Sequence, residues 1–395
     1  MLTPAREFGE ARFQDDQVVV ALPHLRLVLA ELAAELGGGD PAAEVERSED
    51  LGLARVTLHR APLEAWATGR ATAQQADDGA WLSQLLEQLY TEFRARYGGW
   101  TPTMGKNRAV DEVGGNHTIG VGDEGPPTAV TDRQLAPREG DPGTEVRVAV
   151  GDTRLHPHLW LEGSYHAPPA ALWTGGSAAV PYQTGHAGFV VGTILQAAPG
   201  AHVEVRRLLD DDGLADSWDV AKALVRFERL GVHVLNLSLG CFTGDDKPPL
   251  VLQAALERLD PDLVVIAAAG NHAAQMRDRR RPLWPAALPR VVAVGAIDGA
   301  GGVPPWSPEP SGWPWVDVLA TGEDVVSTYV TGPVELPDGP EDFHGLASWS
   351  GTSFAAARLT GEVAAATVPG RIDAATALRG LLECDRGDDG VPRIT

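Results

Sequence analysis

The chain has 395 residues, of which 44% are hydrophobic, and this is enough for one large domain and a smaller one. Its 54 acidic and 32 basic residues give a formal net charge of -22. A nucleic-acid or anionic-membrane surface needs a positive footprint, so neither kind of partner is expected. The two cysteines exclude a disulfide framework.

The N-terminus carries no targeting pattern. Residues 1–10 lack a basic segment followed by an apolar one, and no apolar run approaches the roughly 18 residues that a membrane-spanning helix needs. We therefore predict a cytoplasmic protein.

Residues 1–100 are expected to form a small α+β domain. A helical pattern follows a first apolar strand, three glycines stop that helix, and an acidic connector leads to a second strand. The expected elements are strands over residues 17–22 and 54–58 and helices over residues 25–36 and 82–93.

The composition changes at residue 101. From there to residue 143, glycine, proline and aspartate are frequent and periodicity is weak, which is typical of linkers and long surface loops. This change predicts an N-terminal domain (1–100), a linker (101–145) and a second domain (146–395).

The second domain alternates short apolar strands with helical patterns. The expected strands cover residues 146–150, 203–209, 232–237, 263–269 and 291–296, and expected helices begin at 186, 217 and 250. Nearly continuous apolar strands separated by helices indicate a doubly wound α/β fold, a mostly parallel sheet with helices on both faces. Ligands and catalytic groups gather at the carboxyl ends of such strands.

Four polar residues lie at these strand ends and helix starts. Asp152 follows the first strand, His186 begins an apolar helix, and Asn271 follows the strand that ends at 269. Ser353 comes after a Gly-Thr pair and begins an alanine-rich helix, whose dipole favours a nucleophile. Each has an ordinary structural alternative, such as a cap, a structural histidine or a turn. Together they supply the carboxylate, base, oxyanion donor and nucleophile that acyl transfer needs.

These segments resemble those of the subtilisin-like serine proteases, the subtilases. The resemblance covers about residues 146–370 and includes five further stretches: 208–218, 234–240, 284–286, 291–296 and 349–353. It implies the subtilisin-like fold and the hydrolysis of peptide bonds in protein or peptide substrates, with no required cofactor.

The resemblance also implies a role for each residue. Ser353 would attack the scissile carbonyl, His186 would accept the proton and later donate it, and Asp152 would orient the imidazole. The Asn271 amide and the Ser353 N–H would hold the oxyanion.

Two segments match the substrate-binding strands of the family. Ser238, Leu239 and Gly240 form one of them, and Gly213 and Leu214 belong to the other. Both segments are expected to pair with an extended substrate by strand addition.

Some positions depart from the family pattern. Arg154, Ala187, Thr321 and Ala357 stand where most relatives have Gly, Gly, Pro and Pro. None of these changes removes a reacting group, but small misplacements of catalytic groups lower turnover. A catalytically attenuated subtilase fold that binds peptides or acts as a scaffold is therefore the alternative.

Two other hydrolase classes are disfavoured. The order Asp-His-Ser and the absence of Gly-x-Ser-x-Gly around Ser353 argue against an α/β-hydrolase esterase. The serine-carboxyl peptidases share a Gly-Thr-Ser signature but have no catalytic histidine.

Three polar features allow two interpretations each. The aspartates at 210–212 could hold calcium, but a solvated loop before a helix that Ser217 caps is favoured. Cys241 is expected to fill space instead of acting as a redox group. The basic stretch 277–281 indicates either an exposed loop or a preference for acidic residues before the cleaved bond.

The strand-helix-strand opening of residues 1–100 resembles the propeptides that many subtilases use as folding chaperones and inhibitors. The additional helix and the long linker fit a propeptide less well, so an accessory domain is the other interpretation. An intramolecular contact between this domain and the catalytic domain is a further expectation.

Overall fold

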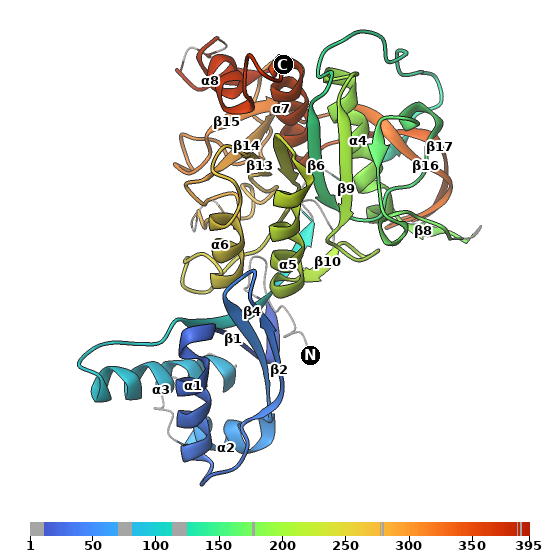
Figure 1. Ribbon diagram of the computed structural model, residues 1–395. Coiled ribbons are helices and arrows are strands. Elements are labelled where there is room, and N and C mark those ends of the chain that lie inside the picture. Colours follow the sequence, from blue (N-terminus) through green and yellow to red (C-terminus); the bar gives the residue numbers. More distant parts are fainter. Residues whose placement is uncertain are drawn as a thin grey trace.

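The computed structural model describes residues 12–69, 81–112, 125–175, 178–276, 278, 280–384, 386–387 and 389–395. Figure 1 shows an N-terminal part in blue and a larger part from green to red, which meet near strand β4 (Met104–Glu112). No helix in these ranges combines the length and the apolar character that a membrane span requires.

The N-terminal part is an antiparallel sheet with helices on one face. Its elements are β1 (Phe13–Ala21), α1 (Leu22–Glu35), β2 (Ala42–Ser48), β3 (Leu53–Leu58), α2 (Arg60–Gly69), α3 (Trp81–Arg96) and β4. The strand order is β2-β3-β1-β4. Successive side chains of a strand point to opposite faces, so Val18 and Val20 pack with the helices while Val19 joins a core shared with the larger part.

The sequence predicted much of the N-terminal part. Both expected strands and both expected helices are present close to their predicted bounds. Strand β2 and helix α2 were not predicted; β2 lies at the outer edge of the sheet, and its charged residues produce no apolar alternation. The stretch 101–145, expected to be a linker, contains β4 and the short strand β5 (Thr128–Ala129).

The larger part has the predicted alternation of strands and helices. Its main elements are β6 (Arg147–Asp152), α4 (His186–Ala197), β9 (His202–Arg207), α5 (Ser217–Phe227), β11 (Val234–Leu237), α6 (Leu250–Glu257), β13 (Val264–Ala268), β14 (Val291–Ile297), β15 (Val318–Thr321), α7 (Thr352–Ala366) and α8 (Ala374–Cys384). Every strand and helix expected in this part is present, with its ends shifted by a few residues.

Within the described residues, eight parallel strands form the central sheet, in the order β18-β15-β14-β13-β11-β6-β9-β7. Its outer strands are β18 (Arg393–Ile394) and β7 (Tyr165–His166). The chain passes from β6 to β9 on one side and later returns to β11 on the other. Strand β6 is therefore the switch point, where an open α/β sheet forms its ligand crevice.

Two layers of helices cover the central sheet. Val148 and Val150 of β6 pack with α4, whereas Ala149 between them packs with α5 and α6. Helix α7 lies on the same side as α4. A hairpin of β16 (Val325–Leu336) and β17 (Gly339–Trp349) packs beside α4. These layers confirm the predicted doubly wound fold.

Strand β4 joins the two parts through backbone pairing. It pairs with β1 near its beginning and, further along, with β10 (Leu214–Asp216) and β12 (Leu239–Gly240) of the larger part. Asp111 faces Leu214 on one edge and Gly240 on the other. The end of β4 therefore lies between β10 and β12.

A side chain of β4 also accepts hydrogen bonds from the first turn of a helix of the larger part. Asn107 is fully buried, and its Oδ1 accepts hydrogen bonds from the Ser217 hydroxyl and the Trp218 N–H, both at 3.0 Å. Its Nδ2 donates to Gln17 on β1. Because the first N–H groups of a helix have no partner inside the helix, Asn107 links α5 directly to the N-terminal sheet.

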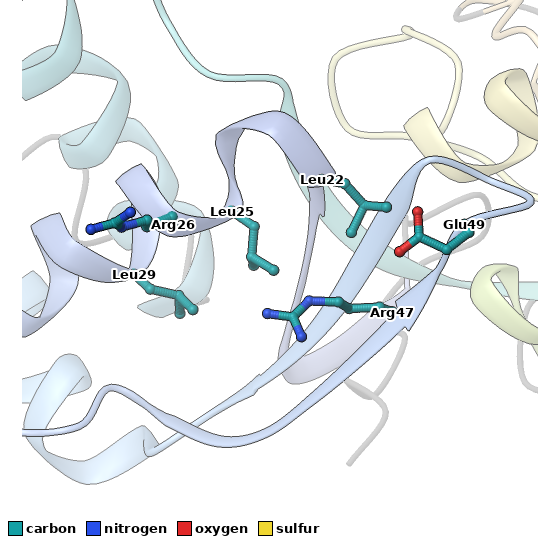
Figure 2. Close-up of a pocket in the computed structure, with 6 residues that line it drawn as sticks. All are labelled: Leu22, Leu25, Arg26, Leu29, Arg47 and Glu49. Carbon is teal, nitrogen blue, oxygen red and sulfur yellow. The ribbon is translucent and has the colours of Figure 1, made fainter.

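A hollow of about 420 Å³ lies on the N-terminal part between α1 and β2 (Figure 2). Its lining residues are Leu22, Leu25, Arg26, Leu29, Arg47 and Glu49. None of them belongs to the predicted catalytic or substrate-binding set.

Candidate active site

Asp152 is the last residue of β6 and is fully buried. Its Oδ1 accepts a hydrogen bond from the Thr153 N–H at 2.7 Å. Both carboxylate oxygens lie 2.9 Å from Nδ1 of His186. A buried carboxylate needs such partners, and a carboxylate that faces Nδ1 fixes the orientation of the imidazole.

His186 is the first residue of α4 and is 1% exposed. The Trp349 ring meets the imidazole edge-on with the ring centroids 5.6 Å apart, and Phe354 lies against it at the same distance. Phe189, one turn further along α4, packs on Phe354 at 4.3 Å. The imidazole is thus held between a carboxylate and a group of aromatic rings.

Ser353 is the second residue of α7, which begins after Gly351. It is buried, and its backbone carbonyl accepts a hydrogen bond from the Ser238 hydroxyl at 3.4 Å. Since the next residue, Phe354, packs on His186, the start of α7 lies beside the start of α4. The helix has 15 residues, and the positive end of its dipole favours negative charge next to Ser353.

Asn271 lies in the turn after β13 and is 7% exposed. Its Oδ1 accepts hydrogen bonds from the N–H and the hydroxyl of Thr352, both at 2.9 Å. The same hydroxyl accepts from the Gly270 N–H at 2.9 Å. Because these bonds hold the Asn271 oxygen, the Nδ2 group is turned the other way, as a donor to an oxyanion requires.

The predicted substrate-binding segments flank the end of β4. Leu214 pairs with Asp111 on one side of this strand. On the other side, Leu239 pairs with Glu112 and Gly240 with Asp111. An extended strand of this chain therefore lies where the sequence predicts that a substrate strand would bind.

The other two predicted residues lie next to these strands. Ser238 immediately precedes β12, and its hydroxyl contacts the Ser353 carbonyl. Gly213 forms the turn before β10 with φ 76°, a conformation that favours glycine.

The departures near Asp152 do not reach its carboxylate. The Nε of Arg154 lies 3.3 Å from the Asp211 carboxylate, and its guanidinium lies 5.9 Å from the centre of the Trp173 ring. The Ala187 N–H donates to the Thr153 hydroxyl at 3.3 Å. Asp152 and His186 keep their contact despite both replacements.

The aspartates at 210–212 are used within their own loop. The Asp210 carboxylate accepts from the Asp212 and Leu214 N–H groups at 3.0 and 2.8 Å. Asp211 faces Arg154 and Arg207. In the described part of the chain, no three His, Cys, Asp or Glu side chains come together as a metal site.

The expectation that Ser217 caps the next helix is wrong. Helix α5 is capped by Asp216, whose carboxylate accepts from the Asp219 N–H at 3.0 Å. The Ser217 hydroxyl donates instead to Asn107 of β4. The sequence around residue 217 could not predict the hydrogen bond from Ser217 to Asn107, because this acceptor comes from the N-terminal part.

Cys241 follows β12 and is 6% exposed. Its backbone N–H and carbonyl pair with Trp284 at 2.8 and 3.0 Å. Burial raises the pKa of the Cys241 thiol to about 12, so the thiol stays neutral, as a space-filling residue would.

The basic stretch 277–281 is described at three positions. Nε of Arg281 donates to Asp246 at 2.9 Å, and the Arg281 side chain is 7% exposed. The Arg280 guanidinium lies 5.7 Å from the centre of the Trp313 ring. Arg277 and Arg279 lie outside the described residues.

Two contributors to the site were not predicted from the sequence. Thr352 fixes the Asn271 side chain although the two are 81 positions apart. The rings of Trp349 and Phe354 hold the imidazole. All three residues lie close to Ser353 in a stretch that the sequence singles out, but a linear pattern does not say which side chains they reach.

Comparisons with known proteins identify the family. A family model described as the subtilase family matches residues 143–376. A thermophilic serine proteinase of Bacillus sp. (strain AK1) is 33% identical over 174 residues, covering 44% of this chain and 38% of that protein. Subtilisin BL of Lederbergia lenta is 30% identical over 234 residues, covering 56% of this chain and 76% of that protein.

A solved structure shows the same fold. Fervidolysin from Fervidobacterium pennivorans, a keratinolytic enzyme related to subtilisin, has a TM-score of 0.57 to this chain at 19% identity. The superposition covers 96% of this chain and 64% of fervidolysin. The match to the family model extends over more than half of the chain, which therefore belongs to the subtilase family of serine proteases.

Proposed function

We propose that this chain is a serine endopeptidase that hydrolyses protein or peptide substrates through an acyl-enzyme on Ser353. The position of His186 carries the proposal: the residue is buried, and Nδ1 lies 2.9 Å from both Asp152 oxygens. An ionised carboxylate only accepts hydrogen bonds, so Nδ1 carries the proton and Nε2 is the basic nitrogen. Phe354, the neighbour of Ser353, lies against the same ring.

In the first half of the reaction, Ser353 Oγ bonds to the substrate carbonyl carbon while His186 Nε2 accepts the hydroxyl proton. The carbonyl electron pair moves to oxygen, where the Asn271 amide and the Ser353 N–H donate hydrogen bonds. When the C=O bond forms again, the C–N bond breaks and His186 passes its proton to the leaving amine. Water then attacks the ester by the same route, which releases the acid and restores Ser353.

Substrates would bind as an added strand between β10 and β12. The support for this step is β4 itself, which pairs in antiparallel fashion with both strands. Backbone pairing supplies affinity for extended chains of any sequence, and pockets beside the strand supply selectivity.

The N-terminal domain would then act as an intramolecular inhibitor. Its strand β4 lies where a substrate strand would bind, and ion pairs of Arg55 with Asp216 and of Lys222 with Glu46 join the same surfaces. These contacts favour the propeptide interpretation over an accessory domain that leaves the strands open. A cytoplasmic location stays a prediction from the sequence.

Covalent labelling tests the catalytic proposal. A fluorophosphonate reacts with a serine only when a neighbouring base activates the hydroxyl. We expect wild-type protein to be labelled and Ser353→Ala to be unlabelled, as seen by gel fluorescence and by mass of the modified peptide.

Ser350→Ala is the matched control, because this hydroxyl accepts from the Asp324 N–H and belongs to the same stretch of chain. It should be labelled like the wild type. Wild-type protein that resists labelling would favour the attenuated scaffold, and labelling that survives in Ser353→Ala would assign the nucleophile elsewhere.

A further inference from the structure

Strand β4 reveals the register in which an extended chain lies against β12. Asp111 stands opposite Gly240, and Glu112 stands opposite Leu239. A substrate in the same register places its next residue opposite Ser238, whose hydroxyl contacts the Ser353 carbonyl. Of the positions in this register, this one lies next to Ser353, so we take it as the residue whose carbonyl the proposed nucleophile would reach.

The register also fixes the side on which this residue carries its side chain. Residues two apart on a strand share a face, and so do residues directly opposite each other on paired strands. The side chain of the reacting residue therefore lies on the face of β12 where Gly240 has no side chain.

Leu283 fills the space on that face. A Cβ at Gly240 would lie 2.7 Å from Leu283 Cγ, and a Cβ at Gly270, in the turn that carries Asn271, would lie 3.0 Å from Leu283 Cδ2. Leu283 is 5% exposed. The Leu283 side chain therefore lies in the gap between the two glycines, next to the His272 ring, whose Nδ1 a Cβ at Gly270 would also meet.

The backbone holds Leu283 in this position. The next residue, Trp284, pairs with Cys241 through two hydrogen bonds, of 2.8 and 3.0 Å. Leu283 thus lies on a segment bonded to the continuation of β12. The Leu283 backbone is therefore fixed, and a larger substrate side chain would require the buried leucine side chain to change its rotamer.

We propose that Leu283 restricts the residue on the acyl side of the cleaved bond to glycine or alanine. The proposal rests on the proposed endopeptidase function and names its selectivity. Larger side chains would have to displace a packed leucine, because protein interiors leave few voids. A hydrophobic pocket discriminates by size in this way.

The charged groups described near this gap do not favour an acidic residue. His272 is buried beside Gly270, and burial lowers its pKa to about 3, so the ring is neutral. The Arg281 guanidinium is bonded to Asp246 and to the Thr243 carbonyl. The described charges therefore do not support a preference for acidic residues, and the size of the gap is left as the basis of selectivity.

Peptide cleavage by the full chain tests the proposal. Fluorogenic peptides that differ only in the acyl-side residue, Gly, Ala, Leu, Phe or Asp, are compared by kcat/KM. We expect the Ala peptide to exceed the Phe peptide about 100-fold. The ratio does not depend on how much of the protein has β4 in place, since that fraction scales both rates equally.

Leu283→Gly should raise the ratio of kcat/KM for the Phe peptide to kcat/KM for the Ala peptide about 100-fold. Leu288→Ala is the control, because Leu288 is buried in the same connecting segment but is not among the atoms nearest to Gly240. Leu283→Ala is a second variant, which enlarges the gap by a smaller amount. Equal cleavage of the Ala and Phe peptides by the wild type, or an unchanged ratio in both Leu283 variants, overturns the proposal.

Binding separates this inference from the proposed function. The full-length Ser353→Ala variant is titrated with the Ala and Phe peptides, and the ratio of their dissociation constants is measured. Preference for Ala supports the role of Leu283, and equal affinity rejects it, whether or not the wild type turns over. Absence of both turnover and fluorophosphonate labelling rejects the endopeptidase proposal alone.

Discussion

The Thr352 hydroxyl makes two hydrogen bonds that hold Asn271 in one orientation. It donates to Asn271 Oδ1 and accepts from the Gly270 N–H, each at 2.9 Å. An amide can flip by exchanging oxygen and nitrogen, and only one of the two orientations presents a donor to the oxyanion. Thr352 is therefore a positioning residue for Asn271.

Thr352→Val should lower kcat about tenfold with little change in KM, because the oxyanion donor matters most in the transition state. Thr352→Ser keeps the hydroxyl and should restore kcat to within about threefold of the wild type. The measurement is steady-state hydrolysis of an Ala peptide.

A double-mutant cycle distinguishes positioning from general destabilisation. On an Asn271→Ala background, Thr352→Val should have almost no further effect on kcat, since the group that it positions is gone. Full additivity of the two losses would contradict the positioning role.

At the scale of elements, β4 belongs to the N-terminal sheet and also contacts α5 of the larger part. Its residue Asn107 accepts hydrogen bonds from Ser217 and Trp218 at the start of α5. The strand thus contacts a helix that lies beside β10, the strand proposed to bind substrate. Asn107 therefore couples docking of the N-terminal domain to order at the start of α5, together with the Arg108 N–H, which donates to the Ser217 hydroxyl at 2.9 Å.

Asn107→Ala should weaken docking by about 1 kcal/mol, the usual cost of losing a helix cap, and raise the rate of peptide hydrolysis several-fold. Asn107→Asp keeps the accepting oxygen but loses the donor to Gln17 and places a charge in a fully buried position, so it should weaken docking as well. Initial rates on the Ala peptide measure the effect. Equal rates in wild type and Asn107→Ala would show that this cap does not hold the strand.

The sequence predicted the elements whose pattern is local. The apolar runs around Val148 and Ile266 lie in buried parallel strands, as expected. Asp152 and His186 contact each other, as the motifs imply. What it missed depends on distant partners. Strand β4 has a weak apolar pattern because it contains polar residues such as Asn107, whose partners lie on α5. The Ser217 hydroxyl bonds to Asn107, 110 positions away, instead of capping its own helix.

At the scale of the whole molecule, a charged cluster lies where the two parts meet. Glu46 of β2 pairs with Lys222 of α5 and with Arg55 of β3, and Arg55 also faces Asp216. Burial opposes ionisation of Glu46, but the hydrogen bond from Lys222 and the charge of Arg55 outweigh it and lower the pKa of Glu46. Burial and the charge of Asp216 raise the pKa of Asp219 in the same cluster.

The sign of the Glu46 contribution follows from its lowered pKa. The stabilisation is fully present above the ordinary pKa of a glutamate, 4.5, and is lost as the pH falls through the lowered value. Asp219 contributes to stability with the opposite sign. Its raised pKa means that the folded protein favours the protonated carboxyl, so the ionised Asp219 lowers the free energy of unfolding above its ordinary pKa.

Glu46→Gln isolates the Glu46 contribution. At pH 7 the variant should be less stable than the wild type by up to about 1 kcal/mol, as for partly exposed ion pairs, and the difference should vanish below the lowered pKa. Urea unfolding of both chains on the Ser353→Ala background, from pH 7 to pH 3, measures it. A difference independent of pH would assign the effect to packing.

Because β4 and β6 belong to one chain, β4 competes with a bound peptide as a tethered segment. A tethered segment competes at an effective concentration on the order of millimolar, so a peptide with the same intrinsic affinity as β4 must approach that level to compete with it between β10 and β12. One cut in the connection turns the competition into a bimolecular one. From that point, occupancy depends on the concentration of the protein itself, and simple dilution releases the strand and opens the site.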